Sequence, residues 1–291
     1  MIEILLPFYG DPRLLREAVG SVLAQTSDDW RLTVVDDCYP DESVGAWLTS
    51  LDDPRVTYHR NDHNLGVNGN FQRCLDLATA DRVTFLGCDD RLMPTYVEVL
   101  ARAAERSSAA MIQPRVVVID EDGEPVRTLA DTVKAALTPG KGAEVLLGGE
   151  SLAASLLRGN WAYFPAICWS REAMARHGFR PGLDLILDLA LILDLLGDGE
   201  SFLLLADTGV AYRRHGSSAS SQGAVDTRRF EEDRRFFADT AERFAAAGWP
   251  RAARAARHRL TSRLHAAALL PRAVRTRDRK VARSLVRHVC R

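Results

Sequence analysis

The first 120 residues alternate short apolar runs with segments whose apolar residues recur at helical spacing. The runs predict β-strands at Ile2–Phe8, Leu32–Asp36, Val56–Arg60, Arg82–Gly87 and Met111–Ile119. The segments between them predict helices at Pro12–Gln25, Glu42–Leu51, Asn68–Ala78 and Thr95–Glu105. The strands are apolar throughout rather than alternating, which indicates a mostly parallel sheet with helices on both faces. The sequence therefore predicts an α/β fold.

Ligands of such sheets bind at the carboxyl ends of the strands, so the residues after each strand are the first candidates for a site. A tyrosine ring can stack on a planar base, and a carboxylate can accept a hydrogen bond from a pyrimidine ring N–H. Each residue also has a structural alternative, as a core aromatic or part of a turn. Together they favour a nucleotide site, and the residues are Pro7, Tyr9, Gly10, Asp11, Asp36, Asp37, Asn61, Asn64–Leu65–Gly66, Asp89 and Asp90.

The adjacent carboxylates Asp89 and Asp90 end the apolar run that starts at Val83. Two ionised carboxylates side by side repel each other unless a cation or several hydrogen-bond donors offset their charge. A divalent cation is one explanation. The other is a helix cap, in which Asp90 caps the helix opened by Pro94 and Asp89 is solvated.

The charge of the chain is unevenly distributed. From Gly216 onward there are 18 Lys and Arg against 7 Asp and Glu, whereas the first 215 residues carry a net charge of −12. Apolar residues at helical spacing in this basic tail predict amphipathic helices. Contact with an anionic membrane surface and simple solvation of the charged face are both open. No nucleic-acid-binding motif accompanies the charge, so we expect no nucleic acid partner.

The apolar runs are too short to span a membrane, which takes about 18 to 20 residues. The chain passes from Met1 directly into its first strand, without a basic start or a cleavage site. We therefore expect a cytoplasmic protein, with peripheral attachment to the inner face of the membrane as the alternative. Five cysteines without CxxC spacing indicate neither a zinc site nor a disulfide framework.

Six short motifs occur in the order and at the spacing of a known enzyme family. They are Leu6–Pro7–Phe8–Tyr9, Ser21–Val22–Leu23–Ala24–Gln25–Thr26, Val34–Val35–Asp36–Asp37, Asn64–Leu65–Gly66, Phe85–Leu86–Gly87–Cys88–Asp89–Asp90 and Tyr212–Arg213–Arg214–His215. Through them, residues 1–220 resemble the inverting family 2 glycosyltransferases of the GT-A fold. The resemblance implies a nucleotide-sugar-binding half at 1–120 and an acceptor and catalytic half at 121–220. Residues 221–291 are then a basic helical extension.

The resemblance also implies a pyrimidine nucleotide-sugar donor, a hydroxyl acceptor and a Mg²⁺ or Mn²⁺ ion. Carried over to this chain, Pro7 and Tyr9 line the base, Asp37 accepts a hydrogen bond from it, and Asp11 lies nearby. Asp36 is the less certain neighbour.

The metal and phosphate contacts follow from the same resemblance. Asp90 is the direct metal ligand, and Asp89 reaches the ribose or a metal-bound water. His215 is a further ligand, with a surface-loop histidine as the alternative, while Arg213 and Arg214 are candidate phosphate contacts. Gly87 stands where many family members have an aspartate, which leaves the number of carboxylate ligands open.

The segment GLDLILDLALILDLLG at 182–197 predicts a helix that is apolar on every side and therefore buried. An aspartate in a buried helix must face a partner or a polar cavity. Asp184 and Asp188 are four residues apart and share a face of this predicted helix. The resemblance assigns the catalytic base to Asp188. Asp184 is the reserve candidate, or a carboxylate at the helix start.

Two further segments are candidates for acceptor contacts. Asn160 and Trp161 belong to an aromatic loop at 159–165 that suits a sugar ring, although aromatic residues before a strand are also typical of a core. Residues 131–142 are predicted to form a loop, with a break at Thr138–Pro139–Gly140.

A non-catalytic GT-A-like protein that binds a nucleotide or a partner remains the alternative function. A nicotinamide-dependent oxidoreductase shares the predicted fold, but Pro7–Phe8–Tyr9–Gly10–Asp11 stands where its glycine-rich fingerprint belongs.

Overall fold

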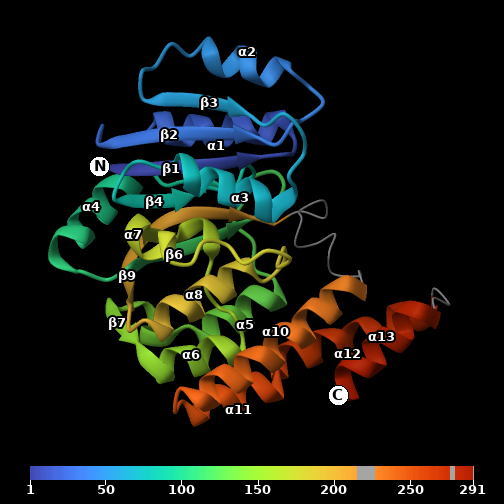
Figure 1. The fold of residues 1–291 in the computed structure, drawn as a ribbon. Helices are drawn as coiled ribbons and strands as arrows, with labels where there is room; N and C mark the ends of the chain where they lie inside the picture. The colour runs from blue at the N-terminus through green and yellow to red at the C-terminus, as the bar shows by residue number, and fades with distance from the viewer. Residues whose placement is uncertain (215–226, 276–278, 291) are drawn as a thin grey trace. The chain divides into compact units, whose positions relative to one another are not determined.

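The computed structural model describes residues 1–214, 227–275 and 279–290, and the chain forms two compact units (Figure 1). The first unit comprises residues 1–128, 139–147 and 163–214. The second comprises residues 129–138, 148–162 and 215–291. The predicted C-terminal extension therefore shares its unit with two segments that the sequence had assigned to the acceptor half.

A mixed, mostly parallel sheet forms the centre of the first unit, as predicted. Its strand order is β3-β2-β1-β4-β8-β6-β9-β5, with β7 paired to β9. The pairs β1–β2, β1–β4, β2–β3 and β6–β9 are parallel, whereas β8 runs antiparallel between β4 and β6. The strands are β1 (Ile2–Phe8), β2 (Trp30–Asp36), β3 (Val56–Arg60), β4 (Arg82–Phe85), β5 (Arg91–Leu92), β6 (Met111–Ile119), β7 (Val145–Gly148), β8 (Cys168–Ser170) and β9 (Ser201–Arg213).

The helices of the first unit have local reasons to begin where they do. In α1, Asp11 caps the N-terminus by accepting from Arg13 N at 2.8 Å, and Pro12 occupies the first helical position, where its missing N–H is harmless. The predicted helices of the first 106 residues all form, with ends that shift by two residues or fewer. The helices are α1 (Pro12–Leu23), α2 (Ser43–Thr49), α3 (Gly66–Leu77), α4 (Tyr96–Arg106), α7 (Arg171–Ala175) and α8 (Leu187–Gly197).

The register of the parallel strands brings their carboxyl ends to one edge of the sheet. Phe8 pairs with Asp36, and Asp36 pairs with Arg60, so β1, β2 and β3 end level with one another. The backbone N–H of Asp37 then donates to Phe8 O at 2.9 Å. Residues that follow these strands are therefore held together, as the sequence predicted.

The second unit is helical. Glu150 in α6 accepts from Arg251 N at 2.5 Å and Ala252 N at 3.4 Å, and so caps the first turn of α11. A small core between α12 and α13 centres on Ala266 and Leu285. No helix in the described parts of the chain is long and apolar enough to cross a membrane. The helices are α5 (Leu129–Leu137), α6 (Gly149–Arg158), α10 (Thr227–Ala246), α11 (Pro250–His258), α12 (Leu260–Arg275) and α13 (Arg279–Cys290).

The prediction of a loop at 131–142 is wrong for most of that segment. Helix α5 runs to Leu137, and a 3₁₀ turn follows at Pro139–Gly142. Residues 129–137 include Leu, Ala and Lys, which favour a helix, and the break at Thr138–Pro139–Gly140 only ends it.

Candidate active site

Asp36, the last residue of β2, is buried and fully engaged by the fold. Its Oδ1 accepts from Tyr39 N at 2.7 Å. Its Oδ2 accepts from the Tyr58 hydroxyl at 2.7 Å and from Arg60 Nη1 at 2.9 Å. Burial, and then the hydrogen bond to Asp36, raise the pKa of Tyr58 to about 12. Asp36 therefore ties β2 to β3.

Asp37 ties the same edge to the start of α3. Its Oδ1 accepts from Asn61 Nδ2 at 2.9 Å and Leu65 N at 2.7 Å, while its Oδ2 accepts from Gly66 N at 3.0 Å. Gly66 has φ of 75°, a left-handed turn that glycine adopts without strain and that the Asn64–Leu65–Gly66 motif predicts. A carboxylate at a helix N-terminus is stabilised by the unpaired amide groups there. Asp37 is only 2% exposed.

Asp90 follows β4 and is 1% exposed. The turn that carries it is closed by a hydrogen bond from Asp90 N to Gly87 O at 3.1 Å. Among the described residues, its carboxylate accepts one hydrogen bond, from Arg213 N at 2.8 Å to Oδ1. Burial, and next the negative charge of Asp89, raise the pKa of Asp90 well above its ordinary value. Asp90 does not cap a helix, which was the alternative left open by the sequence, because α4 begins only at Tyr96.

Gly87 stands directly against the two carboxylates. A Cβ at this position would lie 2.5 Å from Asp90 Oδ2 and 3.0 Å from Asp89 Oδ1. The space that a side chain at residue 87 needs is thus filled by Asp90. The glycine at position 87, where many family members have an aspartate, therefore leaves no unfilled space beside Asp89 and Asp90.

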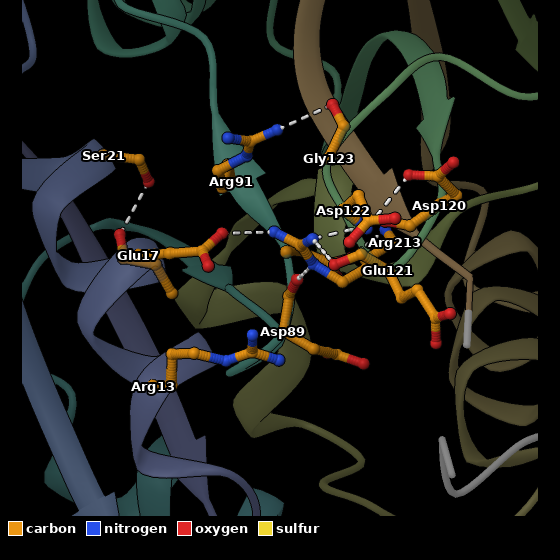
Figure 2. Close-up of polar contacts among 12 residues, drawn as sticks. Arg13, Glu17, Ser21, Asp89, Arg91, Asp120, Glu121, Asp122, Gly123 and Arg213 are labelled. Atoms are coloured by element: carbon orange, nitrogen blue, oxygen red, sulfur yellow. Dashed lines mark hydrogen bonds and ion pairs between the residues drawn. The ribbon is translucent and has the colours of Figure 1, made fainter. Parts of the chain in front are cut away.

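Arg213, the last residue of β9, holds the loop of Asp89 and Asp90 in place. Figure 2 shows its guanidinium among residues from four segments of the chain. Nε donates to Asp89 O at 2.8 Å, and Nη1 donates to Asp120 O at 3.2 Å and Glu121 O at 2.8 Å. Nη2 pairs with Glu17 Oε2 of α1 at 2.5 Å.

The Arg213 side chain is only 1% exposed. Four of its five N–H groups are thus committed to the protein. The prediction that Arg213 contacts phosphate is wrong, since the residue instead positions the acidic pair. Neither the partner Glu17 nor the carbonyls of the 120–121 turn carried a sequence signal, because they lie 92 to 196 positions from Arg213 in the chain.

Tyr9 is exposed at the end of β1. It is 54% exposed, and its ring meets Tyr39 edge-on with centroids 5.4 Å apart. Pro7 pairs with Val35 within the sheet, two residues before Tyr9. About half of the Tyr9 surface is thus open to solvent, after the strand that pairs with β2 and its terminal Asp36.

A family model described as "Glycosyl transferase family 2" matches residues 3–163, more than half of the chain. The chain belongs to this family. Two named proteins are among those similar to this chain. The GalNAc(5)-diNAcBac-PP-undecaprenol beta-1,3-glucosyltransferase of Campylobacter jejuni is 30% identical over 110 residues, which are 37% of this chain and 36% of that protein. The succinoglycan biosynthesis protein ExoW of Rhizobium meliloti is 35% identical over 101 residues, 33% of this chain and 31% of that protein. The chain thus spans about a third of the length of these two relatives.

Solved structures share the fold. The complex of Staphylococcus aureus TarS 1–349 with UDP-GlcNAc superposes with a TM-score of 0.65 at 14% identity, over 82% of this chain and 66% of that one. The structure of TarS 1–349 without a named ligand superposes over 98% of this chain and 89% of that one, with a TM-score of 0.61 and 12% identity. At these identities the likeness establishes the fold.

The family's candidate base, Asp188, lies in the first turn of α8. As predicted, α8 is buried on nearly every side. The prediction that Asp184 shares a face of this helix with Asp188 is wrong, because α8 begins at Leu187 and Asp184 is exposed in the preceding turn. Asn68 Nδ2 donates to both Arg180 O and Leu183 O at 2.8 Å, and so takes the Leu183 carbonyl that a longer helix would use. Asn68 thereby connects α3 with the turn before Asp188.

The remaining candidates differ in their surroundings. Trp161 is fully buried in the second unit and donates from Nε1 to Ser155 Oγ at 3.1 Å, which is the core role that the sequence left open. Asn160 precedes it in the same unit. The Arg214 guanidinium lies over the Tyr212 ring at 5.4 Å, in the first unit. His215 lies outside the described residues.

Proposed function

We propose that this chain is an inverting, metal-dependent glycosyltransferase that moves a sugar from a nucleotide-diphosphate sugar to an acceptor hydroxyl. The observation that carries the proposal is the buried carboxylate of Asp90, which has one hydrogen-bond donor and lies beside Asp89. A buried carboxylate with one donor and a neighbouring negative charge is unfavourable in its ionised form, and a cation would stabilise it. Asp36 and Asp37, by contrast, each accept three hydrogen bonds, so this fold can surround buried carboxylates with donors.

The donor is a pyrimidine nucleotide sugar in this proposal. The exposed ring of Tyr9 suits stacking on a base, and Asp37 Oδ2 accepts one hydrogen bond and has a second lone-pair direction for a ring N–H. UDP and UDP-GlcNAc are the ligands of the TarS structures, which supports this choice. Asp11, which caps α1, lies close in sequence to Tyr9 and completes the predicted nucleotide contacts.

Mg²⁺ or Mn²⁺ would be held by Asp89 and Asp90. Carboxylate oxygens are the ligands these hard cations prefer, and a cation offsets the repulsion that raises the pKa of Asp90. The described residues contain no group of three or more His, Cys, Asp or Glu side chains placed for a metal ion, so the donor's phosphates would complete the shell, with His215 as the further candidate. Such an ion stabilises negative charge on the departing diphosphate.

Asp188 is the proposed general base. It removes the proton from the acceptor hydroxyl as that oxygen attacks the sugar. Asn68 fixes the turn before Asp188, and so connects the base to the helix whose start Asp37 binds.

The acceptor is proposed to be a hydroxyl of a polysaccharide or a lipid-linked saccharide, with a natural product as the other class. The names of two relatives refer to an undecaprenol-linked saccharide and to succinoglycan. Arg214 in the first unit and Asn160 in the second remain the acceptor-side candidates, each within its own unit, whereas Trp161 is buried. The basic helices of the second unit are the candidates for peripheral contact with an anionic membrane, which would bring the enzyme to a lipid-linked acceptor.

The test is consumption of nucleotide sugars by the full chain with Mg²⁺ or Mn²⁺, for the wild type and Asp188→Asn. We expect Asp188→Asn to bind UDP as tightly as the wild type but to lose at least about 100-fold in transfer, in the range for a general base. Asp184→Asn, on the exposed turn four residues earlier, is the matched control and should keep its activity. Unchanged turnover in Asp188→Asn removes Asp188 from its role.

The second candidate function is a non-catalytic protein that binds nucleotide through the same edge. The limited set of metal ligands in the described residues favours it. This function is favoured if UDP or dTDP raises the melting temperature while no nucleotide sugar is consumed with any metal or acceptor.

A further inference from the structure

Three helices of the second unit meet at the hydroxyl of Ser262. Ser262 lies in the first turn of α12, and its Oγ donates to Asp233 Oδ2 of α10 at 2.7 Å. His288 Nε2 of α13 lies 2.8 Å from the same Oγ. Asp233 is 7% exposed and His288 is fully buried. A buried polar network therefore connects α10, α12 and α13.

Three arginines surround this network. Arg259 directly precedes α12 and Arg263 lies one turn later, so the two flank Ser262. Arg234 follows Asp233 on α10. Arg263, Arg234 and Asp233 all act electrostatically on Arg259, so the three arginines and Asp233 form one cluster.

Arg259 is a buried arginine whose guanidinium is not fully hydrogen-bonded by the described residues. The residue is only 6% exposed, and its backbone adopts the left-handed conformation, with φ of 46° and ψ of 43°. Neither its Nη1 nor Nε of Arg263 has a hydrogen-bond partner in the described parts of the chain, although both atoms are buried. Most buried arginines are paired, so this one indicates a missing anion.

The electrostatics of the cluster point the same way. Burial, and next the positive charges of Arg263 and Arg234, lower the pKa of Arg259, and only Asp233 opposes them. A guanidinium stays charged in proteins, so the cluster cannot relieve the repulsion by losing a proton. An external anion with more than one negative charge would offset it.

We propose that Arg259 and Arg263, with Arg234, bind a phosphate or diphosphate group at the start of α12. Guanidinium groups match phosphate oxygens in pairs, and the positive end of a 16-residue helix adds to the attraction. Ser262 and Asp233 position the arginines rather than contact the anion, since the Ser262 proton is already donated to Asp233. The site lies beyond the family match, which ends at residue 163, and does not rest on the proposed transfer reaction.

The burial of Arg259 favours a small soluble phosphate or diphosphate over a lipid headgroup. The experiment therefore uses inorganic phosphate and pyrophosphate, in EDTA-containing phosphate-free buffer at constant ionic strength. A second arm measures cosedimentation with phosphatidylcholine vesicles, with and without phosphatidic acid. The readout of the first arm is the melting temperature of the full chain.

We expect phosphate or pyrophosphate at about 100 times its Kd to raise the melting temperature by about 5 °C. Arg259→Met should abolish this rise, and should melt higher than the wild type without phosphate because an unpaired buried charge is gone. Arg257→Met is the matched control, since Arg257 is exposed two residues earlier, and it should keep the rise. UDP should stabilise both variants as it does the wild type.

Arg259→Lys is the second variant, for use if Arg259→Met fails to fold. It keeps the positive charge but loses the paired N–H donors of the guanidinium, and should weaken phosphate binding about tenfold. Binding of phosphatidic acid vesicles that depends on Arg259, without a response to soluble phosphate, would assign the phosphate to a lipid. The proposal is overturned if the wild type responds to none of these probes. It is equally overturned if Arg259→Met or Arg259→Lys responds as strongly as the wild type.

Discussion

Two pairs of adjacent aspartates follow strands of the same sheet, and the protein treats them in opposite ways. Asp36 and Asp37, at the end of β2, each accept three hydrogen bonds from described residues. Asp90, after β4, is as deeply buried, but its carboxylate accepts one. The same sequence pattern therefore produces one pair in which both carboxylates are well supplied with donors and another in which the buried Asp90 has a single donor.

The donors explain the difference. Around Asp36 and Asp37 the fold arranges a tyrosine hydroxyl, an arginine and the amide groups that open α3. Around Asp90 the nearest arginine, Arg213, turns its guanidinium away to the Asp89 carbonyl, the 120–121 turn and Glu17, and gives Asp90 only its backbone N–H (Figure 2). Arg213 thus fixes the position of the second pair while its guanidinium makes no hydrogen bond to the Asp90 carboxylate.

The largest effect expected from the difference between the two acidic pairs is a loss of transfer activity when Asp90 is replaced. We expect Asp90→Asn to lower kcat/KM for transfer by about 1,000-fold, or about 4 kcal/mol, because an amide binds a divalent cation poorly. Its melting temperature should equal or exceed that of the wild type, since Oδ1 still accepts from Arg213 N and a buried charge is removed. Transfer assays and thermal melts measure both, and a fully active Asp90→Asn enzyme refutes the assignment.

The opposite profile is expected at Asp36. Asp36→Ala removes a buried carboxylate that accepts from the half-buried Tyr58 and Arg60 side chains, and should lower the free energy of unfolding by about 3 to 5 kcal/mol. Any loss of transfer should follow the loss of folded protein. Urea denaturation of Asp36→Ala and of Asp41→Ala, an exposed aspartate nearby, measures the effect. A stable but inactive Asp36→Ala would place Asp36 in the site instead.

The sequence predicted the sheet and the edge because both depend on local patterns. Apolar runs of five to nine residues and the helical spacing between them identified β1 to β4, α1 to α4 and β6 within a few residues. Parallel pairing then brings strand ends together without further information.

The contacts that separate the two acidic pairs were not predictable, because each joins residues far apart in the chain. The pairing of Arg213 with Glu17 spans 196 positions, and the bonds from Asn68 that end the turn before α8 span more than 110. Burial of Trp161 and the start of α8 at Leu187 depend in the same way on tertiary packing.

The smallest predicted effect concerns Gly87, where the second pair is closest to the backbone. A Cβ at residue 87 would lie 2.5 Å from Asp90 Oδ2 and 3.2 Å from its Cγ, so Gly87→Ala must turn the Asp90 carboxylate aside. We expect a loss of about 1 to 2 kcal/mol in stability and about tenfold in metal-dependent transfer. Gly87→Asp should lose at least as much, although it restores the carboxylate that many family members have.

Gly20→Ala is the control for the Gly87 substitution. Gly20 lies within α1, where a Cβ would meet nothing within 4 Å, so the substitution should raise stability by about 0.5 to 1 kcal/mol and leave transfer unchanged. Urea denaturation and metal titration of the transfer rate distinguish the two variants. If Gly87→Ala matches Gly20→Ala in stability and in metal-dependent transfer, Asp90 does not occupy the space next to Gly87. The contrast between Asp90 and the pair Asp36 and Asp37 would then lose its structural basis.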